Sequence, residues 1–305
     1  MKDQSQLAQQ EQTLNYFRKF AEDWRSKAEG GNDKEFNVIE SRNSYVVQVA
    51  KNLQNSRNIQ SALDVGCGTG ELICELGKLG IKSTGIDFSP EMIELAKQKS
   101  TKQNLHGVDF LCTSVFDYKP KNLYFDLISA NGFIEYISEE QLQFFLEHVR
   151  TLLTSSGTLI VGSRNRLFNI FSLNDYTRME CTQSSIRELL EEAIVLANAK
   201  NGVDVIEQLI SLDSPLPRLA QHPLTKVDVT VRHQYTPGEL VHLLQKLGFK
   251  TVNLYPVHYQ AFLPQFKSDF PNLHVDIANL IQGLVVQCPY LIPYCSTFMI
   301  QAVKG

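Results

Sequence analysis

Several features that would mark a secreted, membrane-spanning or nucleic-acid-binding protein are missing from the sequence. No stretch approaches the uninterrupted apolar length of a bilayer-spanning helix. The net charge is −4, which provides no general cationic field for nucleic acid or an anionic membrane. Residues 1–12 are mostly Gln, Asp, Lys and Glu and lack the apolar core of a signal peptide. We therefore expect a cytoplasmic protein without a nucleic-acid partner and without membrane insertion.

Common patterns of cysteine, metal and hydrolase chemistry are missing as well. The six cysteines form no Cys-x-x-Cys and no evident pairing pattern, which suits a reducing compartment. The chain has no zinc-ligand spacing, no phosphate-loop lysine and no Ser-His-Asp order. It does have 305 residues, 43% of them apolar and 20% charged, which is enough for one enlarged domain or for a domain with a cap.

The most informative stretch is residues 63–70, which read Leu-Asp-Val-Gly-Cys-Gly-Thr-Gly and precede a helix-like run over 71–76. This order predicts a strand, a tight glycine turn and a helix. Glycine permits backbone angles that a Cβ forbids, and it lets a ligand approach the chain closely. Free amides at the start of a helix favour electron-rich groups. We expect a nucleotide-like ligand to lie across this turn.

The spacing of Gly66, Gly68 and Gly70 differs from that of the dinucleotide fingerprint. That fingerprint needs its third glycine three positions after the second, where this chain has Glu71. Asp87 closes the next apolar run, and an acid at the end of the second strand suits the two hydroxyls of a ribose. The spacing disfavours an NAD-linked oxidoreductase, which stays as an alternative from a different class.

Together, the glycine stretch and residues 85–92, Gly-Ile-Asp-Phe-Ser-Pro-Glu-Met, resemble the first two motifs of class I S-adenosylmethionine-dependent methyltransferases. The resemblance covers about residues 50–165 and 234–305. It implies S-adenosyl-L-methionine as the cofactor. Family members often have an acid near Thr113, where this chain has Thr113 and Ser114, so Ser114 and a backbone amide are the expected substitutes. The expected cofactor-binding residues of this core are Asp64, Gly66, Cys67, Gly68, Gly70, Asp87, Phe88, Met92, Ser114, Val115 and Asn131.

The alternation of elements predicts an α/β fold, a doubly wound and mostly parallel seven-stranded sheet with helices on both faces. Strands are expected at 61–65, 82–87, 108–113, 125–130, 158–163, 250–255 and 296–303. Helices are expected at 37–53, 70–79, 90–102 and 139–153, with a further helix beginning near Thr236 and an apolar one at 275–286. The ligand should lie at the carboxyl ends of the strands.

Two segments lie outside this core of residues 61–165 and 234–305. Residues 1–60 predict helices, and we expect this N-terminal segment to cover the cofactor. Its aromatic residues Tyr16, Phe17 and Trp24 either pack in a core or contact a ligand. Arg42 is either a candidate partner for the methionine carboxylate, because a guanidinium can hold a carboxylate by two parallel bonds, or an ordinary solvated arginine.

The second segment is the insertion at residues 166–233, with helix-like stretches at about 184–199 and 205–210. It emerges at the expected ligand edge of the sheet, so we interpret it as a helical lid that builds the substrate pocket rather than as a peripheral addition. Its apolar residues predict a largely hydrophobic acceptor pocket. The expected substrate residues are Tyr16, Trp24, Phe133, Tyr136, Arg164, Asn165, Phe168 and Tyr235.

The end of the fourth strand, Asn131-Gly132-Phe133-Ile134, excludes more than it establishes. It differs from the Asn/Asp-Pro-Pro-Tyr signature of methyltransferases that act on amines of nucleic acids. The ubiquinone-pathway O-methyltransferases look distantly similar here, but their Glu-x-x-Glu-His pattern is replaced by Gly132, Glu135 and Tyr136. One of three ligand types remains, so we predict no metal.

These observations predict a methyltransferase that acts on a hydroxyl or carboxyl oxygen of a small, fairly apolar molecule, as in natural product biosynthesis. Methylation of nitrogen or carbon, and a non-catalytic cofactor-binding protein, remain open. A hydroxyl acceptor must lose a proton, for which His233 and His258 are candidate catalytic bases; the alternative interpretation of each is an ordinary surface or structural histidine. The oligomeric state is not specified by the sequence.

Overall fold

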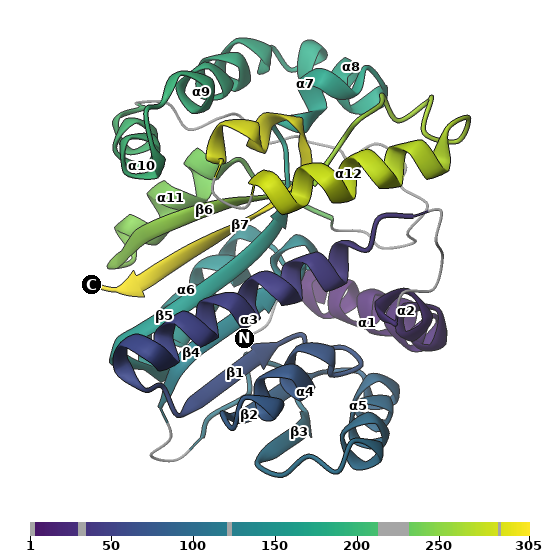
Figure 1. Cartoon of the computed structure of the whole chain (residues 1–305), viewed down its shortest axis with the longest axis vertical. Helices are drawn as coiled ribbons and strands as arrows, with labels where there is room; N and C mark the ends of the chain where they lie inside the picture. The colour runs from purple at the N-terminus through teal and green to yellow at the C-terminus, as the bar shows by residue number, and fades with distance from the viewer. Residues whose placement is uncertain (1–3, 30–34, 121–123, 213–231, 286–287) are drawn as a thin grey trace.

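A computed structural model describes residues 4–29, 35–120, 124–212, 232–285 and 288–305 (Figure 1). Its centre is a seven-stranded sheet with the order β3-β2-β1-β4-β5-β7-β6. β7 is antiparallel to both β5 and β6, and the other pairings are parallel. The predicted fold class is therefore confirmed. The strands are β1 Ser61–Val65, β2 Lys82–Asp87, β3 Val108–Cys112, β4 Phe125–Asn131, β5 Leu153–Arg164, β6 Phe249–Tyr259 and β7 Cys295–Lys304.

Two strands are longer than the sequence pattern predicts. β5 begins at Leu153 rather than at residue 158, because Leu153 pairs with Phe125 across a register shift in β4. β6 continues to Tyr259, since its last residues pair with β7 as far as Cys295. In both cases a neighbouring strand satisfies backbone groups in a segment whose own composition gives no strong strand signal.

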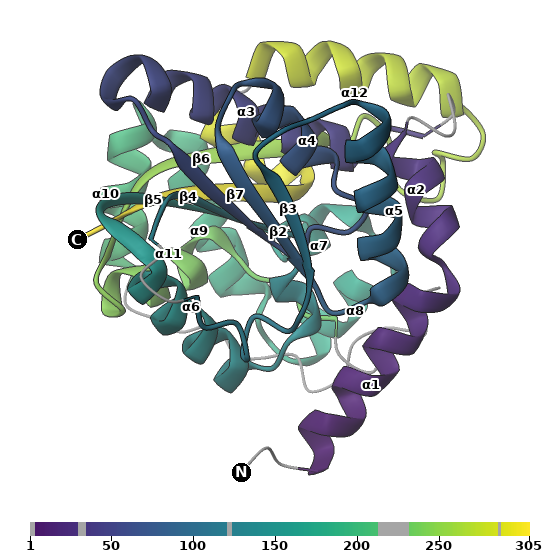
Figure 2. The same cartoon turned by 90° about the horizontal axis from the view of Figure 1, so that it is seen from below.

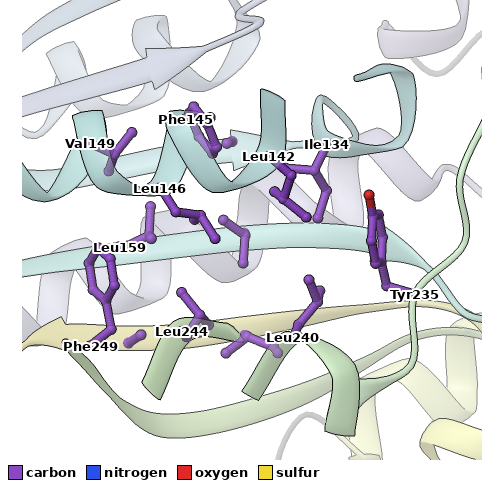
Figure 3. Close-up of a cluster of buried hydrophobic side chains, with 14 of the residues drawn as sticks. Ile134, Leu142, Phe145, Leu146, Val149, Leu159, Tyr235, Leu240, Leu244 and Phe249 are labelled. Carbon is purple, nitrogen blue, oxygen red and sulfur yellow. The ribbon is translucent and has the colours of Figure 1, made fainter. Parts of the chain in front are cut away.

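Helices cover both faces of the sheet, as Figure 2 shows. α3, α4, α5 and α12 lie on one face, where Val46 of α3 and Leu72 of α4 pack on Leu127 and Ile160. α6 and α11 lie on the other face, and Figure 3 shows their apolar side chains meeting those of β5. The bounds are α3 Val38–Arg57, α4 Glu71–Lys78, α5 Pro90–Lys102, α6 Glu139–Leu152, α11 Pro237–Lys246 and α12 Pro271–Val285.

Short polar side chains fix where the helices of the core begin. The Asn37 side chain accepts from Glu40 N at 3.0 Å, and Ser89 accepts from Met92 N before Pro90 opens α5. Ser138 with Gln141 and Thr236 with Glu239 form reciprocal capping boxes. Each cap supplies an acceptor to a helix-start amide that has no partner within its helix, so it also fixes the direction of the loop before it.

Four helices follow the fifth strand: α7 Phe168–Ser172, α8 Asp175–Thr182, α9 Ile186–Asn198 and α10 Gly202–Ser211. α10 packs on α11 and β6, while α9 packs on the 3₁₀ helix η2, Pro289–Tyr294. Residues 213–231 of the insertion, including the proline-containing stretch 214–217, lie outside the described residues.

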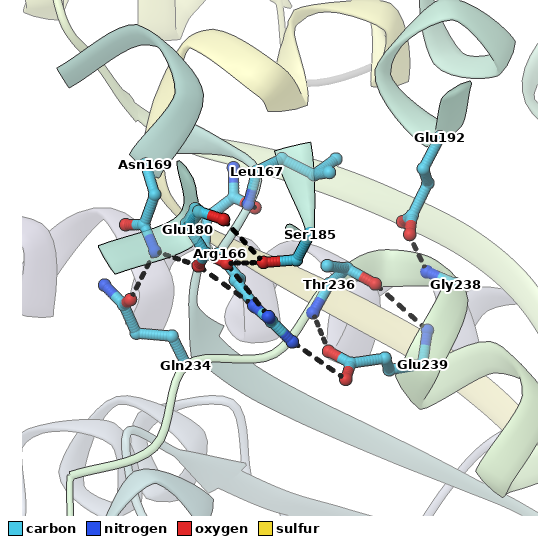
Figure 4. Close-up of polar contacts among 11 residues, drawn as sticks. Arg166, Leu167, Asn169, Glu180, Ser185, Glu192, Gln234, Thr236, Gly238 and Glu239 are labelled. Atoms are coloured by element: carbon cyan, nitrogen blue, oxygen red, sulfur yellow. Dashed lines mark hydrogen bonds and ion pairs between the residues drawn. The ribbon is translucent and has the colours of Figure 1, made fainter. Parts of the chain in front are cut away.

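A buried polar network joins these helices to the core (Figure 4). Arg166, 1% exposed, holds Glu180 of α8 by two bonds of 3.0 and 2.9 Å and lies 3.6 Å from Glu239 of α11. Glu192 of α9 accepts from Gly238 N at 2.7 Å. A buried charge without its partner costs several kcal/mol, so on the order of 3–5 kcal/mol would be lost if either member of the Arg166–Glu180 pair were removed alone.

The N-terminal residues form α1 Gln4–Lys19 and α2 Ala21–Ala28, which pack on α5. Arg18 of α1 lies 3.3 Å from Glu91 of α5, and Gln9 donates to the carbonyl of Tyr136 at 2.9 Å. Tyr136 ends the 3₁₀ helix η1, Ile134–Tyr136. Among the described helices, none combines the length and apolar character needed to cross a membrane.

Candidate active site

A cavity of about 470 Å³ opens at the carboxyl ends of β1, β2 and β4. Its floor is the glycine turn and the strand ends, and its cover is made by α1 and α2. The cavity thus lies at the edge of the sheet where the ligand is expected. The lining includes eleven residues expected from the sequence to bind cofactor, which are Arg42, Asp64, Gly66, Cys67, Gly68, Asp87, Phe88, Met92, Ser114, Val115 and Asn131.

The three glycines of the turn all have positive φ, at 72° for Gly66, 52° for Gly68 and 81° for Gly70. They differ in what surrounds them. A Cβ on Gly68 would meet nothing within 4 Å, so the chain is open to a ligand there. A Cβ on Gly70 would lie 2.8 Å from Ala96 and Phe110. Gly70, which is not among the lining residues, serves close packing of the turn on α5 and β3.

Asp87 is buried at the end of β2 beside the glycine turn. One of its oxygens accepts from Gly68 N at 3.1 Å and the other from Ser89 N at 2.9 Å. Burial raises the pKa of this carboxyl to about 6, although these amide bonds favour the charged form. A carboxylate oxygen can accept more than one bond, so both retain capacity for hydroxyl donors from the cavity.

Asp64 is a second buried acid in the same wall. Burial, together with the nearby charges of Asp87 and Glu71, raises its pKa to about 8. Its Oδ1 is buried and has no hydrogen-bond partner among the described residues. The floor of the cavity can therefore bind a ligand that is positively charged or that donates a hydrogen bond to Asp64.

Arg42 of α3 and Asn131 at the end of β4 form a polar corner of the cavity. Nη2 of Arg42 lies 3.3 Å from Oε1 of Glu135, and a Cβ on Gly132 would lie 2.8 Å from Nη1. Nε of Arg42 and both amide atoms of Asn131 are buried without hydrogen-bond partners in the described part of the chain. Because unpaired buried polar groups are costly, this corner suits a ligand that brings both a carboxylate and an amine.

Aromatic side chains close the cavity from the N-terminal side. The Phe17 ring lies 5.2 Å from that of Tyr136, 5.7 Å from Trp24 and 6.5 Å from Phe88. Phe17 and Trp24 line the cavity, whereas Tyr16 turns to Phe20 at 5.0 Å and does not line it. α1 and α2 thus contribute apolar side chains that cover this side of the cavity.

Of the other expected substrate residues, Phe133, Tyr136 and Arg164 line the cavity, but Asn165, Phe168 and Tyr235 do not. Asn165 is buried, and its amide donates to the carbonyls of Ile292 and Cys295 at 2.6 and 2.9 Å. Tyr235 is fully buried in the core between α6 and α11 (Figure 3). Phe168 begins α7, which packs on α8 and η2. Asn165 thus joins the end of β5 to η2 and β7, and Tyr235 is part of the apolar core.

Neither candidate histidine is in the cavity wall, but one is hydrogen-bonded to a residue that is. Nδ1 of His258 lies 2.9 Å from Oγ of Ser296, a lining residue, and Nε2 lies 3.2 Å from Nε2 of His274. Burial and the charge of Lys267 hold the pKa of His258 well below its usual range. His233 is placed instead by its backbone N, which donates to the carbonyl of Glu135 at 2.7 Å.

Several lining residues were not expected from the sequence. Ser296 and Thr297 could have been identified from the sequence. They stand at the start of the last strand, and the start of an antiparallel strand must lie at the ligand edge. Arg232 precedes the capped start of α11 and carried no motif. The lining residues outside the expected set are Gln10, Thr13, Ala28, Val38, Ile39, Asn43, Val65, Thr69, Glu71, Leu72, Ile86, Thr113, Phe116, Gly132, Glu135, Ile137, Arg232, Ser296 and Thr297.

The described residues contain no group of three or more His, Cys, Asp or Glu side chains that could hold a metal ion. Of the insertion's described residues, Arg232 lines the cavity and residues 166–212 do not. The expectation that the insertion as a whole builds the substrate pocket stays a prediction, because its residues 213–231 lie outside the described part.

Comparison with known proteins shows a likeness to methyltransferases. Residues 62–157 match the family model of the methyltransferase domain. A ubiquinone biosynthesis O-methyltransferase of Bradyrhizobium diazoefficiens is 34% identical over 112 residues, which cover 36% of this chain and 42% of that protein. One from Histophilus somni is 28% identical over 53% of this chain and 67% of its own length. The chain thus spans less than half the length of the first of these relatives.

Solved structures extend the likeness to the whole fold. A magnesium protoporphyrin IX methyltransferase from Synechocystis, solved with bound SAH, has a TM-score of 0.55 at 14% identity and covers 96% of this chain and 98% of its own. A methyltransferase from Clostridium acetobutylicum has a TM-score of 0.54 at 13% identity, with 95% and 99% covered. At this identity the likeness concerns the fold, which is the one predicted from the sequence.

Proposed function

We propose that this chain, a class I S-adenosylmethionine-dependent methyltransferase by its domain match and its sheet order, methylates an oxygen of a small and fairly apolar acceptor. The observation that carries the proposal is the cavity itself. Its polar floor holds buried atoms of Asp64, Arg42 and Asn131 that have no hydrogen-bond partner among the described residues, while its cover is aromatic. The relatives' names, which specify O-methylation, support the choice of oxygen.

The residues present fit S-adenosyl-L-methionine. Asp87 would accept from the ribose hydroxyls, and Ser114 with Val115 would adjoin the adenine. Arg42 and Asn131, whose buried polar atoms have no partners in the described residues, would take the carboxylate and amine of the methionine moiety. Gly68 would allow close approach, because no atom lies within 4 Å of where its Cβ would be.

When bound, this cofactor supplies a methyl group on a positively charged sulfur that leaves as a neutral thioether. The chain's part is to place the acceptor oxygen in line with that methyl and to exclude water, which can supply much of the reduction of the barrier. Phe17 and Trp24 cover the cavity, and Phe133 and Ile137 line it, so the environment is largely apolar.

A hydroxyl acceptor also needs a hydrogen-bond partner that orients its oxygen. The Ser296 hydroxyl in the cavity wall is bonded to Nδ1 of His258, which is bonded in turn to His274. We assign Ser296 the contact with the acceptor and His258 a positioning role through Ser296, because His258 itself is outside the cavity. In this proposal His233 positions Glu135, because its backbone N donates a hydrogen bond to the Glu135 carbonyl.

Transfer of a labelled methyl group tests the proposal. The purified protein is incubated with methyl-labelled S-adenosylmethionine and a small-molecule extract, and products are separated by mass and by stability to alkali. The proposal expects a labelled ether or ester. Labelled products that carry the methyl on nitrogen or carbon would reject O-methylation, and the absence of any labelled product with the cofactor bound would favour a non-catalytic binding protein.

A further inference from the structure

We infer that the acceptor carries a carboxylate and that Arg164 and Arg232 hold it at the wall of the cavity. The inference rests on the proposed function and adds the chemical class of the acceptor. Arg164 is the last residue of β5, and Arg232 lies in the segment that leads to α11. Both line the cavity that Tyr136 and Glu135 also line.

The backbone fixes the two arginines near each other. Tyr235 N donates to the carbonyl of Arg164 at 3.2 Å, and Arg166 N donates to the carbonyl of Tyr235 at 2.9 Å. His233 N, next to Arg232, donates to the carbonyl of Glu135 at 2.7 Å. Residues 232–236 are thus held between the end of β5 and η1. Two cationic side chains reach the cavity from two segments that are hydrogen-bonded together.

No described acid forms an ion pair with either arginine, although the charge of Glu135 acts on Arg164. No hydrogen bond or ion pair joins either guanidinium to a described side chain, and Nε of Arg232 is buried without a partner. Glu135 is the nearby acid, but it is bonded to Arg42 at 3.3 Å. Burial and the neighbouring charge of Arg232 lower the pKa of Arg164. Two like charges held together in this way are costly unless an anion joins them.

The surroundings favour a carboxylate on an apolar body. Burial raises the pKa of Tyr136 to about 12, so its hydroxyl stays a neutral donor. A guanidinium binds a carboxylate through two parallel bonds, and two of them can share its oxygens. Phe17, Trp24 and Ile39 supply apolar lining for the rest of the acceptor. A neutral acceptor would leave both guanidinium groups without a partner.

The test measures equilibrium binding to the protein saturated with S-adenosylhomocysteine. The probes are two acids with their matched primary amides, 4-hydroxybenzoate with 4-hydroxybenzamide and octanoate with octanamide. We expect at least one acid to bind about tenfold or more tightly than its amide, as loss of a charged hydrogen bond implies. Arg164→Gln and Arg232→Gln should each abolish that preference, and Arg164→Lys should restore part of it.

Arg178→Gln is the matched control, because Arg178 is an exposed arginine of α8 that pairs with Asp175 on the surface. Binding of S-adenosylhomocysteine in every variant reports that the fold is intact. If no acid is preferred over its amide, or if the preference survives in Arg164→Gln and in Arg232→Gln, the inference is overturned while the proposed function stands. Failure of the unsubstituted protein to bind S-adenosylhomocysteine would instead reject the proposed function.

Discussion

At the scale of single residues, Asp87 carries the most specific assignment. It is buried, bonded to two backbone amides and placed beside the glycine turn. We predict that Asp87→Ala or Asp87→Asn weakens cofactor binding by roughly 1–3 kcal/mol, the cost of losing a charged hydrogen-bond partner. Asp109→Asn, at an exposed position of the adjacent strand, is the control and should bind normally. Calorimetry decides, and unchanged affinity in Asp87→Asn would refute the ribose assignment.

Asp64 makes cofactor binding depend on pH. Its pKa of about 8 means that it is largely protonated at neutral pH in the free protein. A cationic ligand stabilises the carboxylate and lowers this pKa, so binding releases a proton and affinity rises with pH until about 8. The rise cannot exceed about tenfold per pH unit for a single group.

The measurement is the affinity for S-adenosylmethionine between pH 6 and 9, combined with calorimetry in buffers of different ionisation enthalpy. Asp64→Asn should remove the proton release that is assigned to this group. A flat affinity profile in the unsubstituted protein would show that the ligand's positive charge does not interact with Asp64.

At the scale of elements, the N-terminal helices act as the cover of the site. Phe17 of α1 joins Trp24, Phe88 and Tyr136, which come from three other segments. We predict that Phe17→Ala speeds release of S-adenosylhomocysteine by about threefold to thirtyfold, since the apolar contacts that close the cavity are lost. Trp24 is the single tryptophan of the chain and lines the cavity, so its fluorescence reports release directly.

Phe266→Ala is the comparison, because Phe266 is 48% exposed and does not line the cavity. Equal release rates in the two variants would show that α1 does not retain the ligand.

The helices inserted after β5 are joined to the core by the buried charged groups around Arg166. One buried acid in these helices, Glu192, lowers the stability of the fold at neutral pH. Burial raises the pKa of Glu192 to about 7 from its ordinary value near 4.5. The acid is therefore favoured in its neutral form, and stability is lost as the pH rises from about 4.5 through 7. We predict that Glu192→Gln is more stable than the unsubstituted protein at pH 8, by roughly 1–3 kcal/mol, but not at pH 4.5.

Denaturant unfolding at the two pH values measures this difference. Glu191→Gln, its exposed neighbour on α9, should show little change at either pH. A destabilised Glu192→Gln at pH 8 would mean that the charged form is the one that Gly238 and Thr236 stabilise.

The sequence predicted elements whose evidence is local, and it was weaker where position depends on distant contacts. The glycine turn, Asp87 and the capped helix starts are local patterns, and their positions in the sheet follow from the alternation of strands and helices. Asn165 and Tyr235 were expected at the substrate because they adjoin the ligand edge. Their side chains point into the core instead. Asn165 donates to the carbonyl of Ile292 in η2, and Tyr235 belongs to the same buried cluster as Leu240 of α11.

At the scale of the whole molecule, the sheet order brings five distant segments to one edge. Asp87 ends β2, Asn131 ends β4, Arg164 ends β5, and Ser296 lies near the start of β7. Helix α1 lies over this edge (Figure 1). The antiparallel direction of β7 is what puts Ser296 at the carboxyl ends of the parallel strands. One edge thus combines groups suited to the cofactor with groups suited to the acceptor.

The most direct test of the account is calorimetric titration of the intact protein with S-adenosylmethionine, S-adenosylhomocysteine and NAD in parallel. We expect saturable binding of the first two at one site, with loss of affinity in Asp87→Asn, and no competing binding of NAD. Tight binding of NAD without any response to S-adenosylhomocysteine would contradict it.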